Sequence, residues 1–403
     1  MTCARFRSSP WYFAILLTIL PTILSLLASC DLLALIGDVE DPEGEQTPPP
    51  PAITMMSLGF RTSMLIKDDG ILYATGSNGS GEMGAIDIQP RLDFGVIRIG
   101  VKAAFCGPAA GAFFINEDGS LHASGGNSWG QLGAGSSLRV GSALIPLGEG
   151  VRFKQIAFTG TSSLALDESG EVWVTGDNNE GSVRAADGTA PRGDRFAKLS
   201  APGYLQNVKA IAGSSNHSLY ILQDGSVWAC GDNAFGQLGT GGSKIGDVKA
   251  RQMLYVENAV AVAAGANHSL ILDPDGNLYA CGSNADGQLG TGDTSITEFS
   301  APSRVMTKVK AIASSQNTSY ALTLDGELFA SGDNTYGQAG TGSASDVFGF
   351  TNIMSDVESI AAGTRHAIFL KKDKSLWAVG HNYFGQLGDC TDANRSKPVR
   401  VYY

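Results

Sequence analysis

The sequence predicts an all-β fold, a seven-bladed β-propeller closed by pairing of the N- and C-terminal segments. The motif Gly-x-Asn-x-x-Gly occurs seven times, at an even spacing of about 50 residues. Each copy is also flanked by short apolar segments that have the character of strands. Repeats of about 40 to 50 residues that carry several short strands each are typical of propellers.

The motif copies are recognised by their asparagines, which lie 48 to 55 residues apart. These are Asn78, Asn127, Asn178, Asn233, Asn284, Asn334 and Asn382. So regular a period indicates one structural unit repeated along the chain. Because Asn and Gly favour turns and positive φ angles, we interpret both as structural residues of a repeated loop.

Each unit is predicted to hold four antiparallel strands. In the fifth unit, the apolar segment 268–272 is followed by Asp275-Gly276, a dipeptide that favours tight hairpins, and then by the apolar segment 278–280. A further strand such as 309–313 precedes each hairpin, and segments such as 303–306 suggest a fourth.

The two ends of the repeat array predict how the ring closes. Segment 397–401 has the character of the strand that opens the other units, and the first unit begins abruptly at Ala52. We therefore expect the last segment to complete a blade with the first. A linear stack with two open edges is the alternative.

Composition excludes several other classes. The chain contains 52 glycines among 403 residues, which disfavours long helices. With 43% hydrophobic and 17% charged residues it has the material for a large core. Its net charge of −11 repels phosphate, so we expect no nucleic-acid partner.

The first 29 residues are predicted to be a lipoprotein signal peptide. Arg5 and Arg7 precede an uncharged, mainly apolar run over 11–27, and the segment 27–30 resembles the lipobox of bacterial lipoproteins. The resemblance implies lipid attachment at Cys30 and a lipid-anchored, exported protein of the bacterial cell envelope. An uncleaved membrane anchor and a plain secretory signal are the alternatives. An acidic, Pro-rich linker is predicted for 30–51 and the propeller for 52–403.

Several copies extend the motif in a way that is specific to one family. Residues 231–241, 282–292 and 332–342, and 380–388 in a shortened form, resemble the repeat of the regulator-of-chromosome-condensation family. The resemblance covers roughly 52–403 and implies a seven-bladed propeller. The family's founding activity is guanine-nucleotide exchange on a nuclear GTPase, which the export signal argues against here. Other members bind proteins, and some secreted bacterial relatives inhibit enzymes.

We expect a non-enzymatic, monomeric protein that binds an unknown envelope or extracellular protein through its propeller loops, without metal or cofactor. An enzyme inhibitor and a glycan-binding propeller are the alternatives. His217, His268 and His366 occupy equivalent positions and are interpreted as structural. Candidate partner contacts are aromatic residues that precede the second motif glycine, and arginines of the degenerate third copy. They are Trp129, Phe235, Tyr336 and Phe384, and Arg184, Arg192 and Arg195. Packing of the aromatic residues on a neighbouring blade is the alternative.

Overall fold

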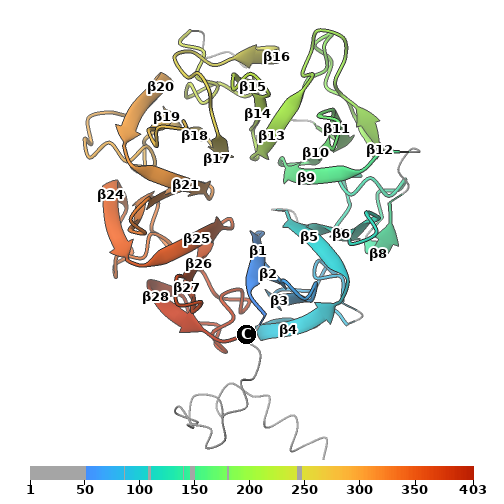
Figure 1. The fold of residues 1–403 in the computed structure, drawn as a ribbon, viewed down its shortest axis with the longest axis vertical. Helices are drawn as coiled ribbons and strands as arrows, with labels where there is room; N and C mark the ends of the chain where they lie inside the picture. Colours follow the sequence, from blue (N-terminus) through green and yellow to red (C-terminus); the bar gives the residue numbers. More distant parts are fainter. Residues whose placement is uncertain are drawn as a thin grey trace, which may run out of the picture. The chain divides into compact units, whose positions relative to one another are not determined.

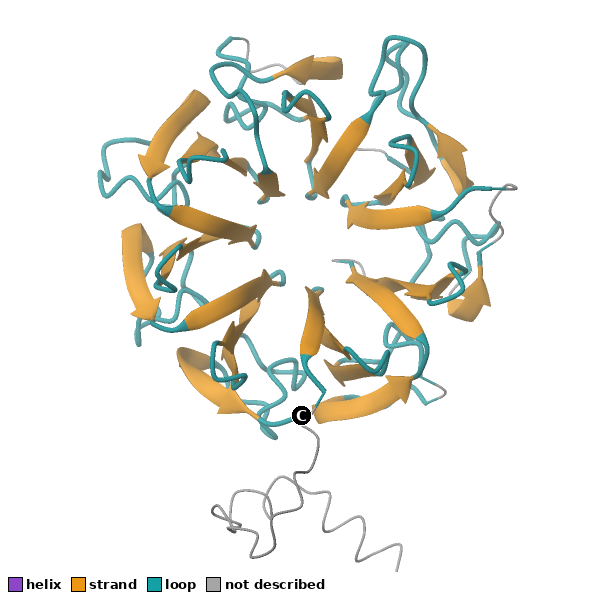
Figure 2. Ribbon diagram, viewed as in Figure 1, coloured by secondary structure: helices purple, strands orange, loops and turns teal. Residues whose placement is uncertain are grey.

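The computed structural model describes residues 51–85, 87–107, 110–138, 140–145, 150–178, 181–242 and 247–403. These residues form seven four-stranded antiparallel sheets around a central axis and contain no helix (Figure 1, Figure 2). The predicted seven-bladed propeller is confirmed. The predicted signal peptide, the linker up to Pro50 and Cys30 lie outside the described residues.

The innermost strand of each blade faces the central axis, and the second strand lies against it (Figure 1). The innermost strands are β1 (Ile53–Leu58), β5 (Val101–Cys106), β9 (Phe153–Phe158), β13 (Val208–Gly213), β17 (Ala261–Ala264), β21 (Val309–Ser314) and β25 (Val357–Ala362). The second strands are β2 (Thr62–Lys67), β6 (Gly111–Asn116), β10 (Ser162–Asp167), β14 (His217–Leu222), β18 (His268–Leu272), β22 (Thr318–Thr323) and β26 (His366–Lys371).

The third strand leads into the motif loop, and the fourth returns along the outer edge of the blade. The third strands are β3 (Leu72–Gly76), β7 (Leu121–Gly125), β11 (Val172–Gly176), β15 (Val227–Gly231), β19 (Leu278–Ser283), β23 (Leu328–Gly332) and β27 (Leu376–Gly380). The outer strands are β4 (Arg91–Arg98), β8 (Val140–Leu144), β12 (Gly193–Lys198), β16 (Asp247–Gln252), β20 (Glu298–Met306), β24 (Val347–Met354) and β28 (Arg395–Val401).

The core lies between blades. Seven hydrophobic clusters each combine side chains of two neighbouring blades, so every blade is covered on both faces. Strand β2 is accordingly buried along its whole length, as are β10 and β22. This sheet-on-sheet packing is the reason that these strands carry apolar residues on both faces.

The ring closes, but not by a blade shared between the two ends. Strand β28 pairs with β27 in the last blade, and β1 pairs with β2 in the first, so the predicted pairing of the terminal segments is wrong. Because each blade consists of four consecutive strands, no strand among the described residues is left over to complete another blade. Closure instead comes from face packing, in which Leu58 and Leu65 join Ile368 and Val401 in one cluster.

Candidate partner-binding face

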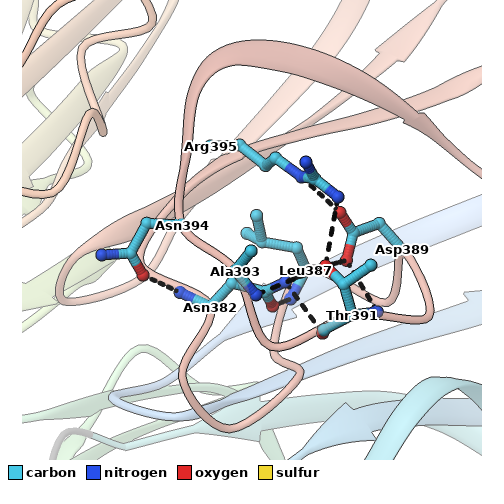
Figure 3. Close-up of polar contacts among 7 residues, drawn as sticks. All are labelled: Asn382, Leu387, Asp389, Thr391, Ala393, Asn394 and Arg395. Carbon is cyan, nitrogen blue, oxygen red and sulfur yellow. Dashed lines mark hydrogen bonds and ion pairs between the residues drawn. The ribbon is translucent and has the colours of Figure 1, made fainter.

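The seven motif loops lie on one face of the ring and are fixed by the repeated asparagine. In every blade its buried Oδ1 accepts a hydrogen bond from the backbone N–H five residues later, at distances of 2.8 to 3.1 Å. Figure 3 shows the last of these loops, where Asn382 also donates from Nδ2 to Asp389 at 2.8 Å. Arg395 donates from Nε to the same carboxylate at 2.6 Å, which ties the loop to the start of β28. The motif thus builds a rigid platform.

The two motif glycines allow the loop to approach other backbone closely. Gly231 has a φ of 119°, and a Cβ there would lie 2.4 Å from the carbonyl oxygen of Asn216 in the turn between the first two strands. A Cβ on Gly236 would lie 2.5 Å from Cα of Ser300 on the outer strand of the next blade. Each loop is therefore held by its own blade and by its neighbour.

Two of the predicted aromatic contacts are exposed on these loops. Trp129 is 44% exposed and Phe235 is 39% exposed. Their backbone N–H groups donate to the side-chain oxygens of Gln131 and Gln237, both at 3.0 Å, so the loop backbone that carries each ring is held in place. Rigid, exposed aromatic side chains are typical anchors in protein interfaces.

The other two predicted aromatic contacts, Tyr336 and Phe384, are half-buried against the next blade. Arg365 donates from Nη1 to the Tyr336 hydroxyl at 3.0 Å, and its Cζ lies 4.8 Å from the ring centroid. In the same way, Cζ of Arg61 lies 4.3 Å from the centroid of Phe384. For these two residues the structure bears out the alternative of packing on a neighbour.

These contacts define an arginine–aromatic cluster that sequence reasoning missed. It comprises Phe60, Arg61, Tyr336, Arg365, His381 and Phe384, from the sixth, seventh and first blades. The His381 ring lies 4.8 Å from that of Tyr336 and 6.2 Å from that of Phe384. Burial, with the nearby Arg365 and Arg61 charges, lowers the pKa of His381 below its ordinary value.

Comparison of the seven repeats with one another would have singled out these two arginines. The residue before the second strand is Asn216, Asn267 and Asn317 in three consecutive blades, but Arg365 and Arg61 in the next two. That departure from the pattern falls on the same face as the motif loops.

A cavity of about 580 Å³ connects the cluster to Trp129. Phe60, Arg61, Glu82 and Trp129 line it, together with turns of the innermost strands. It opens beside a central channel of about 200 Å³ to which all seven blades contribute residues. One cavity therefore lies between the exposed Trp129 and the two cluster residues of the first blade, Phe60 and Arg61.

The three predicted arginines lie elsewhere, on the rim of the third blade. Arg192 pairs with Asp177 at 3.7 Å, and Arg195 is exposed on the outer strand β12. Arg184 is half-buried and donates from Nη1 to the carbonyl of Gly188 at 3.4 Å. None of the three lines the cavity. The structure does not bring them together with the cluster.

The described residues offer no grouping of three or more His, Cys, Asp or Glu side chains suited to a metal ion. The thiol of Cys106 borders the cavity, but burial raises its pKa to about 12, so it stays protonated at neutral pH. No helix among the described residues is long and apolar enough to span a membrane.

Comparison with known proteins decides the family. The model of the RCC1-like domain matches residues 142–402, which is more than half of the chain. The chain belongs to the RCC1-like domain family. The resemblance of the loop motif to that family is thereby confirmed.

Curated relatives match over a limited stretch. The RCC2 homologue of Xenopus laevis is 33% identical over 134 residues, which is 32% of this chain and 25% of the relative. The human protein named probable E3 ubiquitin-protein ligase HERC3 is 32% identical over 157 residues, which is 38% of this chain and 15% of that protein. The matched part is therefore a quarter or less of the length of these relatives.

Solved structures match over nearly the whole propeller. Prp20p from Saccharomyces cerevisiae, described with its binding to Gsp1p and histones, has a TM-score of 0.71 at 19% identity and covers 88% of each chain. Human WBSCR16 has a TM-score of 0.60 at 19% identity, over 88% of this chain and 84% of its own. At such identities the likeness establishes the fold alone.

Proposed function

We propose that this RCC1-like propeller is a non-enzymatic interaction module that binds a protein partner through its motif-loop face. The observation that supports this most is the hollow on that face, which is bordered by exposed Trp129 and by Phe60 and Arg61 of the arginine–aromatic cluster. Protein interfaces are enriched in aromatic residues and arginine, and their energetic centres combine such anchors with pockets.

The module is further proposed to be an exported lipoprotein of the bacterial envelope, anchored through Cys30. The support is the order of positive residues, apolar run and lipobox-like segment in the sequence. An exported protein has no access to a nuclear GTPase, so we do not propose nucleotide exchange. The binding of Gsp1p and histones is a property of Prp20p.

The test of binding is affinity capture from envelope extract with the full chain as bait and mass spectrometry as readout. We expect one stoichiometric protein, whose capture falls at least about tenfold when Trp129 and Phe235 are changed to Ala, since anchor residues contribute about 2 kcal/mol or more each. Tyr255→Ala is the matched control. Tyr255 is 78% exposed, and it follows an outer strand and so lies on the opposite face.

Each outcome of the capture has a distinct meaning. Equal loss with Tyr255→Ala would contradict the assignment of the binding face. Capture of an envelope hydrolase with loss of its activity would identify an inhibitor. A complete absence of protein partners would contradict the proposal and favour glycan binding, which a glycan array then tests.

Anchoring is tested separately by Cys30→Ala. We expect the variant to leave the detergent phase, because lipid attachment requires the thiol. A Cys106→Ala variant, which keeps the lipobox-like segment, serves as the control. Full retention of the Cys30 variant in detergent would rule out the lipid anchor.

A further inference from the structure

Within the part of the chain that the structure describes, the two arginines of the cluster have N–H donors without a partner, although Arg365 uses Nη1 to bind the Tyr336 hydroxyl. Cζ of Arg61 lies 4.6 Å from the Phe60 centroid and 4.3 Å from that of Phe384. Rings stacked in this way leave the edges of a guanidinium, where its N–H donors lie, open. Among the residues that the structure describes, neither Arg61 nor Arg365 forms an ion pair with a carboxylate.

The fold does not need these side chains. In the equivalent turns of other blades, Asn317 donates from Nδ2 to Asp286 at 2.9 Å and Asn216 donates to Asn267 at 3.1 Å. The structural role of the position belongs to its backbone carbonyl, which accepts from the residue after the first motif glycine. Arg61 and Arg365 make this same bond, to Ser77 and His381. An asparagine would therefore serve the fold as well as an arginine.

His381 adds a third donor to the cluster. Gln386 accepts from the Phe384 N–H through Oε1, so the group within 2.6 Å of His381 Nδ1 is the donating Nε2 amide of Gln386. Nδ1 is therefore an acceptor, and the neutral ring carries its proton on Nε2. An anion bound beside the ring would raise the pKa of His381, because it would offset the two arginine charges that now lower it.

Resting on the proposed function, we propose that the arginine–aromatic cluster binds the carboxylate of an acidic segment in the protein partner. The edges of Arg61 and Arg365 donate to it, as guanidinium groups do to carboxylates, and the rings of Phe60, Tyr336 and Phe384 flank it. Charge complementarity supports this choice, since Arg61 and Arg365 are two positive charges with no ion-pair partner among the described residues, in a chain of net charge −11.

Acidic side chains on the same face bear on the choice between a carboxylate and a phosphate. The loops of the fourth to sixth blades carry Asp232, Asp286 and Asp333 on the same face. Burial, together with the nearby charges of Asp346 and Asp333, raises the pKa of Asp286 above its ordinary value. A dianion would meet twice the repulsion from these groups and also twice the attraction of Arg61 and Arg365, so comparison with a phosphoserine peptide distinguishes the two anions.

The test is binding of a capped tetraglutamate peptide to the full chain, compared with a capped tetraglutamine peptide of the same length. We expect tetraglutamate to bind at least about tenfold more tightly, from hydrogen bonds to charged groups. Binding should weaken as salt is added, and saturation should raise the pKa of His381 measured by NMR.

Charge-matched variants locate the site. Arg61→Gln with Arg365→Gln should abolish the preference for glutamate. The control variant, Arg304→Gln with Arg400→Gln, should retain the preference for glutamate. It removes the same charge from exposed positions on outer strands, and one of its arginines, Arg400, is also stacked on an aromatic ring, that of Tyr402. Thermal unfolding of both double variants checks that they are folded. Should Arg61→Gln with Arg365→Gln prove unstable, the asparagine versions, which copy the other blades, replace it.

Three results would overturn the inference: equal binding of the two peptides, equal effects of the two double variants, or an unchanged His381 pKa at saturation. Tighter binding of a phosphoserine peptide than of tetraglutamate would assign the cluster to phosphate instead. Failure here with successful capture through Trp129 and Phe235 would leave the proposed function intact, because that capture does not depend on the arginines.

Discussion

Three buried histidines join neighbouring blades through single hydrogen bonds. Nε2 of His217, His268 and His366 lies 2.8 to 2.9 Å from the hydroxyl of Ser269, Ser319 and Ser63, each in the next blade around the ring. Each serine hydroxyl donates its own proton to a backbone carbonyl, so Nε2–H of the histidine is the donor in the bond between them. The interpretation of these histidines as structural agrees with this geometry.

The histidines make stability depend on pH. Burial lowers the pKa to about 4 for His217 and to about 3 for His268 and His366, whereas the unfolded chain has ordinary values near 6.5. Between pH 6.5 and those values the unfolded state binds more protons, so the free energy of unfolding falls as the pH falls. We expect a loss of roughly 1.4 kcal/mol per pH unit for each histidine.

Denaturant unfolding between pH 6.5 and 4.5 measures this slope. His366→Thr should reduce it, since Thr62 and Thr318 occupy the equivalent position and carry no charge. Asp and Glu side chains titrate mainly below this window. A slope identical in the variant and the parent protein would contradict the assignment of a neutral, buried His366.

At the scale of the strand hairpin, the turn between the second and third strands sets the register of each blade. Gly225 has a φ of 81°, and its five Gly counterparts share the positive φ. In the seventh blade Lys374 takes the place of this glycine and adopts a φ of 67°, so the turn keeps its shape without glycine. The Asp-Gly hairpins predicted from sequence are therefore present, and Asp224 accepts from the Ser226 N–H at 2.9 Å.

Packing makes some turn glycines irreplaceable. A Cβ on Gly225 would lie 2.4 Å from Cα of Asn258, whereas a Cβ on Gly203, with a φ of 77°, would meet nothing within 4 Å. We expect Gly203→Ala to cost roughly 1 to 2 kcal/mol from backbone strain alone. Gly225→Ala should cost roughly 3 kcal/mol or more, because backbone must also move. Equal losses in chemical denaturation would show that the contact with Asn258 is unimportant.

At the scale of the whole ring, the closing junction repeats the contacts of the internal ones. Ser63 donates to the carbonyl of Gln386 at 2.6 Å across the closing junction, and Ser269 donates to that of Gln237 at 2.7 Å between the fourth and fifth blades. Each serine also accepts from a histidine of the preceding blade. The junction between the last and first blades is therefore held by the same type of hydrogen bonds as this internal junction.

This equivalence predicts equal costs for equal changes. Ser63→Ala and Ser269→Ala should each lower the free energy of unfolding by roughly 1 to 3 kcal/mol, since each removes the acceptor of a buried histidine N–H and the hydroxyl donor to a buried carbonyl. Within the described part of the chain, the Gln237 carbonyl keeps only the weak donor Cys281 Sγ, at 3.6 Å. Thermal and denaturant unfolding of the two variants provides the measurement. A negligible effect of Ser63→Ala beside a large effect of Ser269→Ala would indicate that the closing junction is open in solution.

The sequence by itself determined the number of blades, their strands and the structural role of the repeated Asn and Gly, because these depend on contacts repeated at a fixed period. It also named Trp129, Phe235, Tyr336 and Phe384 as candidate partner contacts without separating the first two, which are exposed, from the last two, which pack on a neighbouring blade. Only the tertiary structure decided how the ring closes, because the strand register of the terminal blades depends on pairing partners. It alone also assembled the arginine–aromatic cluster, since Arg61 and Phe384 are adjacent only after the first and last blades meet.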